Sequence, residues 1–227
     1  MSKYILSIIC LALSLCATAK DHEGIVTENL NAGGFTLISQ SKPVSLVVAD
    51  SDKKGIHIAV RNLQKDFERV CGNQAQLLKA PANGISHCVN VGSLESPYIK
   101  QMVKAKKINE KELKGKVEKY VMTVVSNPLP GVEEALVIAG SDMRGTIYGI
   151  YELSEQIGVS PWYDWMDVPA VQHKNLAIQR GTYTAGEPAV RYRGLFLNDE
   201  APCLTTWVKN TFGTNYGGHE FYARVFE

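Results

Sequence analysis

Residues 135–158, ALVIAGSDMRGTIYGIYELSEQIG, combine a short apolar run, a glycine-flanked turn and a helical pattern. The run ALVIAG is typical of a buried strand. Apolar side chains then recur at helical spacing from Ile147 to Ile157, with Asp142 placed to cap the helix and Gly158 placed to end it. A buried strand that leads into an amphipathic helix predicts an α/β fold.

The same alternation extends towards the N-terminus. Further strands are predicted at 44–50 (VSLVVAD), 87–92 (HCVNVG) and 119–125 (KYVMTVV), and apolar residues at helical spacing predict a helix over 56–70. Strands that alternate with helices predict a mixed or parallel sheet covered on both faces. We assign residues 25–165 to one sandwich-like α/β domain.

The pattern changes after this domain. Residues 166–190 show no helical period and only a short strand-like run near Leu176, so we assign them to a connector. The stretch 190–198, VRYRGLFLN, predicts a fresh buried strand, and 217–227 predicts the first turns of an amphipathic helix. Residues 191–227 therefore form the beginning of a separate unit.

Residues 1–19 have the layout of a secretory signal peptide, with one early lysine, an apolar core at 4–16 and an A-x-A cleavage site. The core is too short to span a bilayer comfortably, and no other stretch predicts a span. We expect export to the periplasm or the extracellular space. Lipid attachment at Cys16 is the less favoured alternative, because Leu15 is a poor match for the small residue expected before such a cysteine.

Charge and cysteine usage argue against several classes of protein. The 24 lysines and arginines balance 23 acidic residues without a basic stripe, so nothing favours nucleic-acid binding. Signal cleavage would leave Cys71, Cys88 and Cys203, an odd number whose spacing matches no metal site. Buried thiols are favoured, and a disulfide between Cys71 and Cys88 stays open.

The stretch GSDMRGT at 140–146 resembles a phosphate-binding loop, but the lysine of that motif is missing and no G-x-G-x-x-G occurs. Two other interpretations are stronger. The glycines can permit a tight strand-to-helix turn with close backbone approach. Alternatively, Arg144 can reach from this turn to the carboxylate of an anionic sugar through two parallel hydrogen bonds.

Two further motifs each have a functional and a structural interpretation. In PWYDWMD at 161–167, Trp162 can stack on a sugar ring, or the aromatic residues can form a hydrophobic plug between domains. Asn198, Asp199 and Glu200 follow the predicted strand at 190–198. Such residues face the active site in a barrel of parallel strands, but they could equally cap a helix or turn.

Two long motifs, RGTIYGIYELSEQIGVSPWYDWMDVP at 144–169 and EPAVRYRGLFLNDEAPCLTTWV at 187–208, resemble glycoside hydrolase family 115, the xylan α-1,2-glucuronidases. The resemblance covers residues 44–227. It implies an N-terminal α/β domain, a (β/α)8 barrel with the active site, and further C-terminal domains. It also implies release of glucuronic acid or its 4-O-methyl ether from xylan, with inversion at the anomeric carbon.

Under this resemblance the first barrel strand ends at Asn198 and Asp199, on the catalytic side. Asp199 would bind sugar hydroxyls or help to orient the attacking water. Glu200 would cap a helix or support its neighbours. The implied substrate is glucuronoxylan or an acidic xylo-oligosaccharide, no metal or organic cofactor is implied, and a homodimer of the full-length protein stays open.

The resemblance also implies missing parts. A barrel needs roughly 250 residues, whereas 37 residues run from Arg191 to Glu227. Inverting glycosidases hold two carboxyl groups roughly 6.5–9.5 Å apart. Asp199 and Glu200 cannot be that pair, because adjacent side chains on a strand point to opposite faces. The general acid is therefore expected beyond Glu227, and the chain is expected to be an N-terminal fragment that is inactive alone. The alternative is a non-catalytic carbohydrate-binding or scaffold protein that kept this N-terminal domain.

Overall fold

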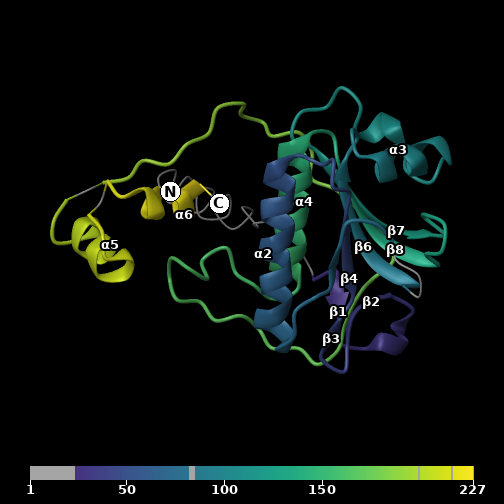
Figure 1. The fold of residues 1–227 in the computed structure, drawn as a ribbon, viewed down its shortest axis with the longest axis horizontal. Helices are drawn as coiled ribbons and strands as arrows, with labels where there is room; N and C mark the ends of the chain where they lie inside the picture. Colours follow the sequence, from purple (N-terminus) through teal and green to yellow (C-terminus); the bar gives the residue numbers. More distant parts are fainter. Residues whose placement is uncertain (1–23, 82–84, 199, 216, 227) are drawn as a thin grey trace, which may run out of the picture.

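The computed structural model describes residues 24–226 except 82–84, 199 and 216, and its centre is a mixed sheet of six strands (Figure 1). Four strands, β4 (Ser45–Val48), β5 (Leu77–Leu78), β6 (His87–Ser93) and β8 (Glu134–Gly140), run parallel, while β7 (Tyr120–Ser126) runs antiparallel to β8 and β10 (Thr182–Tyr183) antiparallel to β7. All four predicted strands of this domain form. The spatial order of the strands is β10, β7, β8, β6, β4 and β5.

Helices cover both faces of this sheet, as predicted. Helices α2 (Lys54–Cys71) and α4 (Met143–Gln156) lie side by side on one face, and α3 (Pro97–Lys104) lies on the other (Figure 1). The short 3-10 helix η2 (Glu110–Glu112) follows α3. Helix α2 ends at Gly72, whose φ of 79° suits glycine best. The long apolar strands place one core under α2 and α4 and a second core under α3.

A second, antiparallel sheet has four short strands, in the order β1 (Val26–Thr27), β9 (Leu176–Ile178), β2 (Phe35–Ser39) and β3 (Lys42–Pro43). The 3-10 helix η1 (Leu30–Ala32) lies between β1 and β2. Only the run near Leu176 was predicted. Phe35 and Ile38 of β2 are fully buried in the core that α2 covers, so this sheet belongs to the same packed unit.

The segment assigned as a connector, 166–190, contributes a strand to each sheet. Its β9 lies between β1 and β2, and its β10 extends the large sheet beside β7. The chain therefore returns to the α/β domain after α4 and leaves it again only after Tyr183.

The predicted strand at 190–198 does not form. The structure assigns no strand there, none of the described strands pairs with these residues, and Tyr192 and Phe196 are 83% and 91% exposed. A strand needs a neighbour to satisfy its backbone N–H and C=O groups, and this segment has none among the described residues. The barrel strand is therefore not confirmed.

Two helices complete the described chain. Helix α5 (Leu204–Phe212) follows the exposed segment, and α6 (His219–Phe226) confirms the helix expected near the C-terminus; both lie to one side of the α/β domain (Figure 1). Cys71 and Cys88 are buried free thiols, whereas Cys203, expected to be buried, is exposed and free. The predicted signal peptide, 1–19, lies outside the described residues. Within the described chain, no helix is both long and apolar enough to cross a bilayer.

Candidate functional site

The GSDMRGT motif forms the junction between β8 and α4. The two carboxylate oxygens of Asp142 accept hydrogen bonds from the backbone N–H of Gly145 (2.8 Å) and of Glu118 (2.9 Å). A Cβ atom on Gly145 would lie 2.3 Å from the carbonyl oxygen of Lys119. The motif is therefore a tight turn that requires glycine for close backbone approach, which confirms the structural interpretation of these residues.

Arg144 projects from this turn and pairs with a buried carboxylate. Its guanidinium lies 3.0 Å from the carboxylate of Glu118, which is 7% exposed, while the Arg144 side chain is 60% exposed. Glu118 also accepts hydrogen bonds from Arg193 and from the hydroxyl of Tyr148. The guanidinium of Arg144 is thus held by Glu118 on one side and exposed to solvent on the other.

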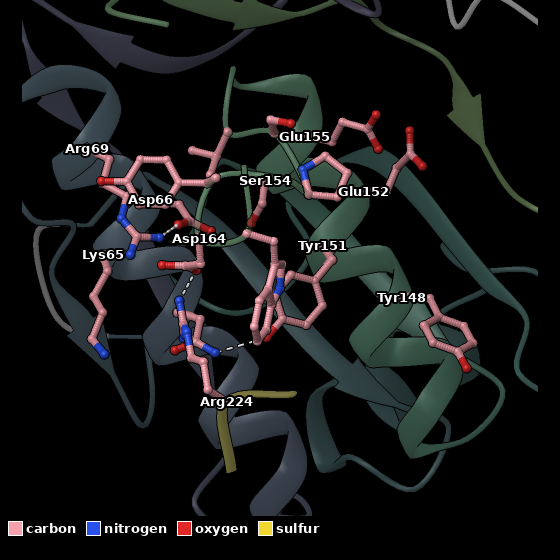
Figure 2. Close-up of a pocket in the computed structure, with 16 residues that line it drawn as sticks. Lys65, Asp66, Arg69, Tyr148, Tyr151, Glu152, Ser154, Glu155, Asp164 and Arg224 are labelled. Atoms are coloured by element: carbon pink, nitrogen blue, oxygen red, sulfur yellow. Dashed lines mark hydrogen bonds and ion pairs between the residues drawn. The ribbon is translucent and has the colours of Figure 1, made fainter. Parts of the chain in front are cut away.

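A polar cleft of about 430 Å³ is lined by residues of α2, of α4 and of the segment 159–165, and by Arg224 (Figure 2). Figure 2 shows Asp66, Arg69, Asp164 and Arg224 gathered at one end and Tyr148 at the other. The wall carries four carboxylates, three cations and several aromatic rings. They are Asp66, Glu152, Glu155, Asp164, Lys65, Arg69, Arg224, Tyr148, Tyr151, Tyr163 and Trp165.

Internal pairs hold most of these charges. Arg69 lies 2.8 Å from Asp66, and its guanidinium stacks 4.2 Å above the ring of Tyr163. Arg224 pairs with Asp164. Such pairs fix carboxylate oxygens in place while leaving lone pairs to accept further hydrogen bonds.

The floor of the cleft is built by α4 and its neighbours. Glu152 accepts hydrogen bonds from Gln156 (3.0 Å) and from the hydroxyl of Tyr120 (3.3 Å). Burial, with the charge of Glu152 as a lesser cause, raises the pKa of Tyr120, which therefore stays a donor. The buried hydroxyl of Ser154 also lines the cleft, and among the described residues it has no hydrogen-bond partner.

An apolar pocket of about 640 Å³ adjoins the polar cleft and shares Pro161 and Trp165 with it. Trp162, which is 56% exposed, lines this pocket. The rings of Trp165 and Trp207 lie 5.9 Å apart, with Trp207 supplied by α5. The predicted sugar-stacking residue therefore lies beside aromatic side chains and next to a polar cleft.

Among the described residues, no hydrogen bond or ion pair joins the predicted site residues to one another. Asn198 and Glu200 are exposed, and among the described residues neither is hydrogen-bonded to Arg144 or Trp162. Asp199 lies outside the described residues. The apolar pocket reaches the predicted strand only through Leu195 and Leu197.

Sequence reasoning missed Glu118 and Asp66 as members of charged clusters. Glu118 lies in a lysine-rich stretch that predicts only solvent exposure. Asp66 and Arg69, three residues apart on one helix, carry the one signal that could have been read in advance. In the described chain, no group of three histidine, cysteine or acidic side chains is placed to hold a metal ion.

Comparisons with known proteins give the family. The model "Glycosyl hydrolase family 67 N-terminus" matches residues 18–153, more than half of the chain, and "Glycosyl hydrolase family 115" matches residues 185–227. The α/β domain thus belongs to the N-terminal domain family of glycosyl hydrolase family 67, which places the chain among glycoside hydrolases. More particularly, the chain is a relative of glycoside hydrolase family 115.

A solved structure supports the second assignment. It is described as a family GH115 4-O-methyl-alpha-glucuronidase with specificity for decorated arabinogalactans, and it is 29% identical with a TM-score of 0.66 over 81% of this chain. The present chain covers 22% of the length of that protein. A second structure, described as CpGH84D, is 10% identical to this chain, with a TM-score of 0.40. The match covers 68% of this chain and 22% of that protein, and it is too weak to support any argument. None of the curated proteins matches the chain.

Proposed function

We propose that the chain is the N-terminal part of an exported glycosidase that removes glucuronic acid or 4-O-methyl-glucuronic acid side chains from xylan. The observation that carries this proposal is the family 115 match over residues 185–227, which includes Asn198, Asp199 and Glu200. The structural relative is described as a 4-O-methyl-alpha-glucuronidase, which supports the acidic sugar, although its stated specificity is for decorated arabinogalactans.

The proposed chemistry is inverting hydrolysis by two carboxyl groups, one protonating the leaving oxygen and one activating water. Asp199 orients the water or binds sugar hydroxyls, with Asn198 and Glu200 beside it. Arg144 and Trp162 contribute to substrate binding, Arg144 through a charge-assisted hydrogen bond to the sugar carboxylate. The open side of the Arg144 guanidinium leaves donors for this bond.

One carboxyl group of the pair is proposed to come from outside residues 191–227. Asp199 and Glu200 are neighbours, and inverting enzymes need a separation of roughly 6.5–9.5 Å to accommodate the water. The 227-residue chain alone is therefore expected to release no uronic acid.

The test is to read the gene beyond the codon of Glu227, express the encoded protein, and measure released 4-O-methyl-glucuronic acid by NMR. Glucuronoxylan and a decorated arabinogalactan are the two substrates. Release from glucuronoxylan as the β-anomer is expected, with a loss of about 100-fold or more in Asp199→Asn and none in the exposed Glu133→Gln. Release from the arabinogalactan alone would overturn the xylan assignment. A stop codon directly after Glu227 would overturn the catalytic assignment.

A non-catalytic carbohydrate-binding role is the second candidate, and the polar cleft beside Trp162 and Trp165 favours it. Aromatic faces stack on pyranose rings, and the fixed carboxylates of the cleft accept hydrogen bonds from hydroxyls. Four carboxylates against three cations disfavour an anionic ligand and favour a neutral xylo-oligosaccharide. The volume of about 430 Å³ is within the range of small-molecule sites.

Calorimetric titration of the 227-residue chain with xylohexaose tests this role. Trp162→Ala should weaken binding by up to about tenfold, whereas Met166→Ala, also exposed but lining neither pocket, should not. The same affinity in wild type and Trp162→Ala, or no binding to wild type, would remove this candidate.

A further inference from the structure

Glu118 occupies an unusual position at the entrance to β7. Its φ of 56° lies in the left-handed region, which residues other than glycine seldom adopt. Its carboxylate is also buried, at 7% exposure. A buried carboxylate on a strained backbone is costly unless surrounding groups hold it in place, so its partners indicate what it does.

The carboxylate of Glu118 is shared by two arginines that come from different parts of the chain. Arg144, at the start of α4, lies 3.0 Å away, and Arg193, just before the exposed residues 194–198, donates to the other carboxylate oxygen. Arg193 also donates to the hydroxyl of Tyr148 (2.9 Å), which itself lies 3.5 Å from Glu118. The charge-assisted bond to Glu118 raises the pKa of Arg193.

The backbone around Glu118 is fixed by the turn between β8 and α4. The Glu118 N–H donates to Asp142 at 2.9 Å. Lys119 and Ser141 exchange two hydrogen bonds, from Lys119 N–H to the Ser141 hydroxyl (3.0 Å) and from Ser141 N–H to the Lys119 carbonyl (2.8 Å). The carboxylate is thus held by rigid elements of the α/β domain.

A second tether lies a few residues upstream of Arg193. The carboxylate of Glu187 accepts from the Val117 N–H at 2.8 Å and pairs with Lys116 at 3.1 Å. Thr184 donates to the carbonyl of Tyr120. The stretch from β10 to Arg193 therefore follows the entrance of β7, and Arg193 is its last described tether before residues 194–198.

We propose that Glu118 is a positioning residue: by holding Arg193, it fixes where the segment that begins at Gly194 leaves the α/β domain. The consequence for sugar binding by Asn198 and Glu200 rests on the proposed function. Because two guanidinium groups share one carboxylate, removing the Glu118 charge leaves two cations facing each other, whereas removing Arg144 leaves Arg193 as the sole cationic partner of Glu118. Loss of the Glu118 charge should therefore release Arg193, whereas loss of Arg144 should not.

Trypsin cleavage of the 227-residue chain measures this directly and needs no substrate. A guanidinium engaged by Glu118 cannot enter the specificity pocket of trypsin, so cleavage after Arg193 reports its release. Arg191, two residues away in the same exposed segment, is the internal control. The measured quantity is the ratio of initial cleavage rates after Arg193 and after Arg191, determined by mass spectrometry.

Glu118→Gln should raise this ratio about tenfold, the factor that corresponds to 1.4 kcal/mol. Tyr148→Phe should raise it less, and Arg144→Met should leave it unchanged or lower it. Glu134→Gln, which breaks a comparable, partly buried pair with Arg180, is the matched control. Melting temperature is recorded for each variant, because general unfolding would raise both cleavage rates together.

An unchanged ratio in a folded Glu118→Gln protein would overturn the proposal. If Glu118→Gln does not fold, the cleavage ratios of Tyr148→Phe and Arg144→Met test the proposal instead. Equal ratios in these two variants and in wild type would also overturn the proposal. If Glu118→Gln raises the ratio but the protein encoded by the gene read beyond Glu227 releases no glucuronic acid, the positioning role stands and only the proposed function is refuted.

Discussion

Replacing Gly145 by alanine tests whether helix propensity or packing has the larger effect on the free energy of unfolding at this position. In an exposed helix interior, glycine to alanine stabilises by about 1 kcal/mol. At Gly145 the new Cβ would lie 2.3 Å from the Lys119 carbonyl oxygen and 2.9 Å from the Glu118 carbonyl carbon, both backbone atoms. Overpacking of this kind costs about 1–3 kcal/mol. Moving the helix start also weakens the Asp142 cap, which contributes about 1 kcal/mol.

The net expectation for Gly145→Ala is a loss of about 2 kcal/mol in the free energy of unfolding, equivalent to a melting temperature about 4–8 °C lower. Urea unfolding followed by circular dichroism measures it. Gly55→Ala in the first turn of α2 is the matched control, because its Cβ would meet side-chain atoms and no backbone: the flexible Met143 sulfur at 3.0 Å and the Ile147 Cδ1 at 3.4 Å. It should stay within about 1 kcal/mol of wild type. A Gly145→Ala protein as stable as wild type would refute the packing argument.

Three further predictions concern single side chains. Asp142→Ala should lower the free energy of unfolding by about 1–2 kcal/mol in chemical denaturation, because two backbone N–H groups lose their acceptor. At pH 8, peptide mapping after iodoacetamide should find Cys203 alkylated and Cys88 unmodified, because burial raises the pKa of Cys88 to about 12; rapid labelling of Cys88 in the folded protein would contradict this. Burial raises the pKa of the Asp52 carboxyl group above its ordinary value of 3.8. The stability that this carboxyl group contributes is therefore fully present below pH 3.8 and is lost as the pH rises through the pKa of the folded state. Asp52→Asn, which keeps an acceptor for Ser96, should therefore gain stability relative to wild type between pH 3 and pH 7 in urea unfolding, and a difference independent of pH would exclude this cause.

The large sheet and its helices were predictable because their signals are local. Strands β4, β6, β7 and β8 are continuous apolar runs, and α2 and α4 carry apolar residues at helical spacing. Of the small sheet only the run of β9 was predicted, and β1 and β3 have two residues each, too few to show a period. Its β2–β3 turn places Gln40 and Ser41 at φ values of 49° and 61°, without the Asn-Gly or Asp-Gly pair that normally marks such a hairpin.

The charged clusters depend on tertiary structure and therefore had almost no signal. Arg144 meets Glu118 only because the entrance of β7 packs against the start of α4, and Asp164 meets Arg224 only because α6 folds back. The opposite error, a predicted strand that does not form, concerns residues 190–198. The apolar composition of that stretch predicts a strand, but a strand also needs a partner, and composition cannot report whether one is present.

The position of β9 and β10 changes where the α/β domain should be said to end. A boundary at residue 165, drawn where the helical pattern stops, would remove β9 from between β1 and β2 and would leave those two strands without a common neighbour. Leu176, Ala177 and Ile178 are almost fully buried, so the same cut would open the core that Phe35 and Ile38 share with α2. It would also strip β10 from β7 and expose that edge. The α/β domain therefore extends at least to Tyr183, and ten residues further along the chain Arg193 still contacts it through Glu118.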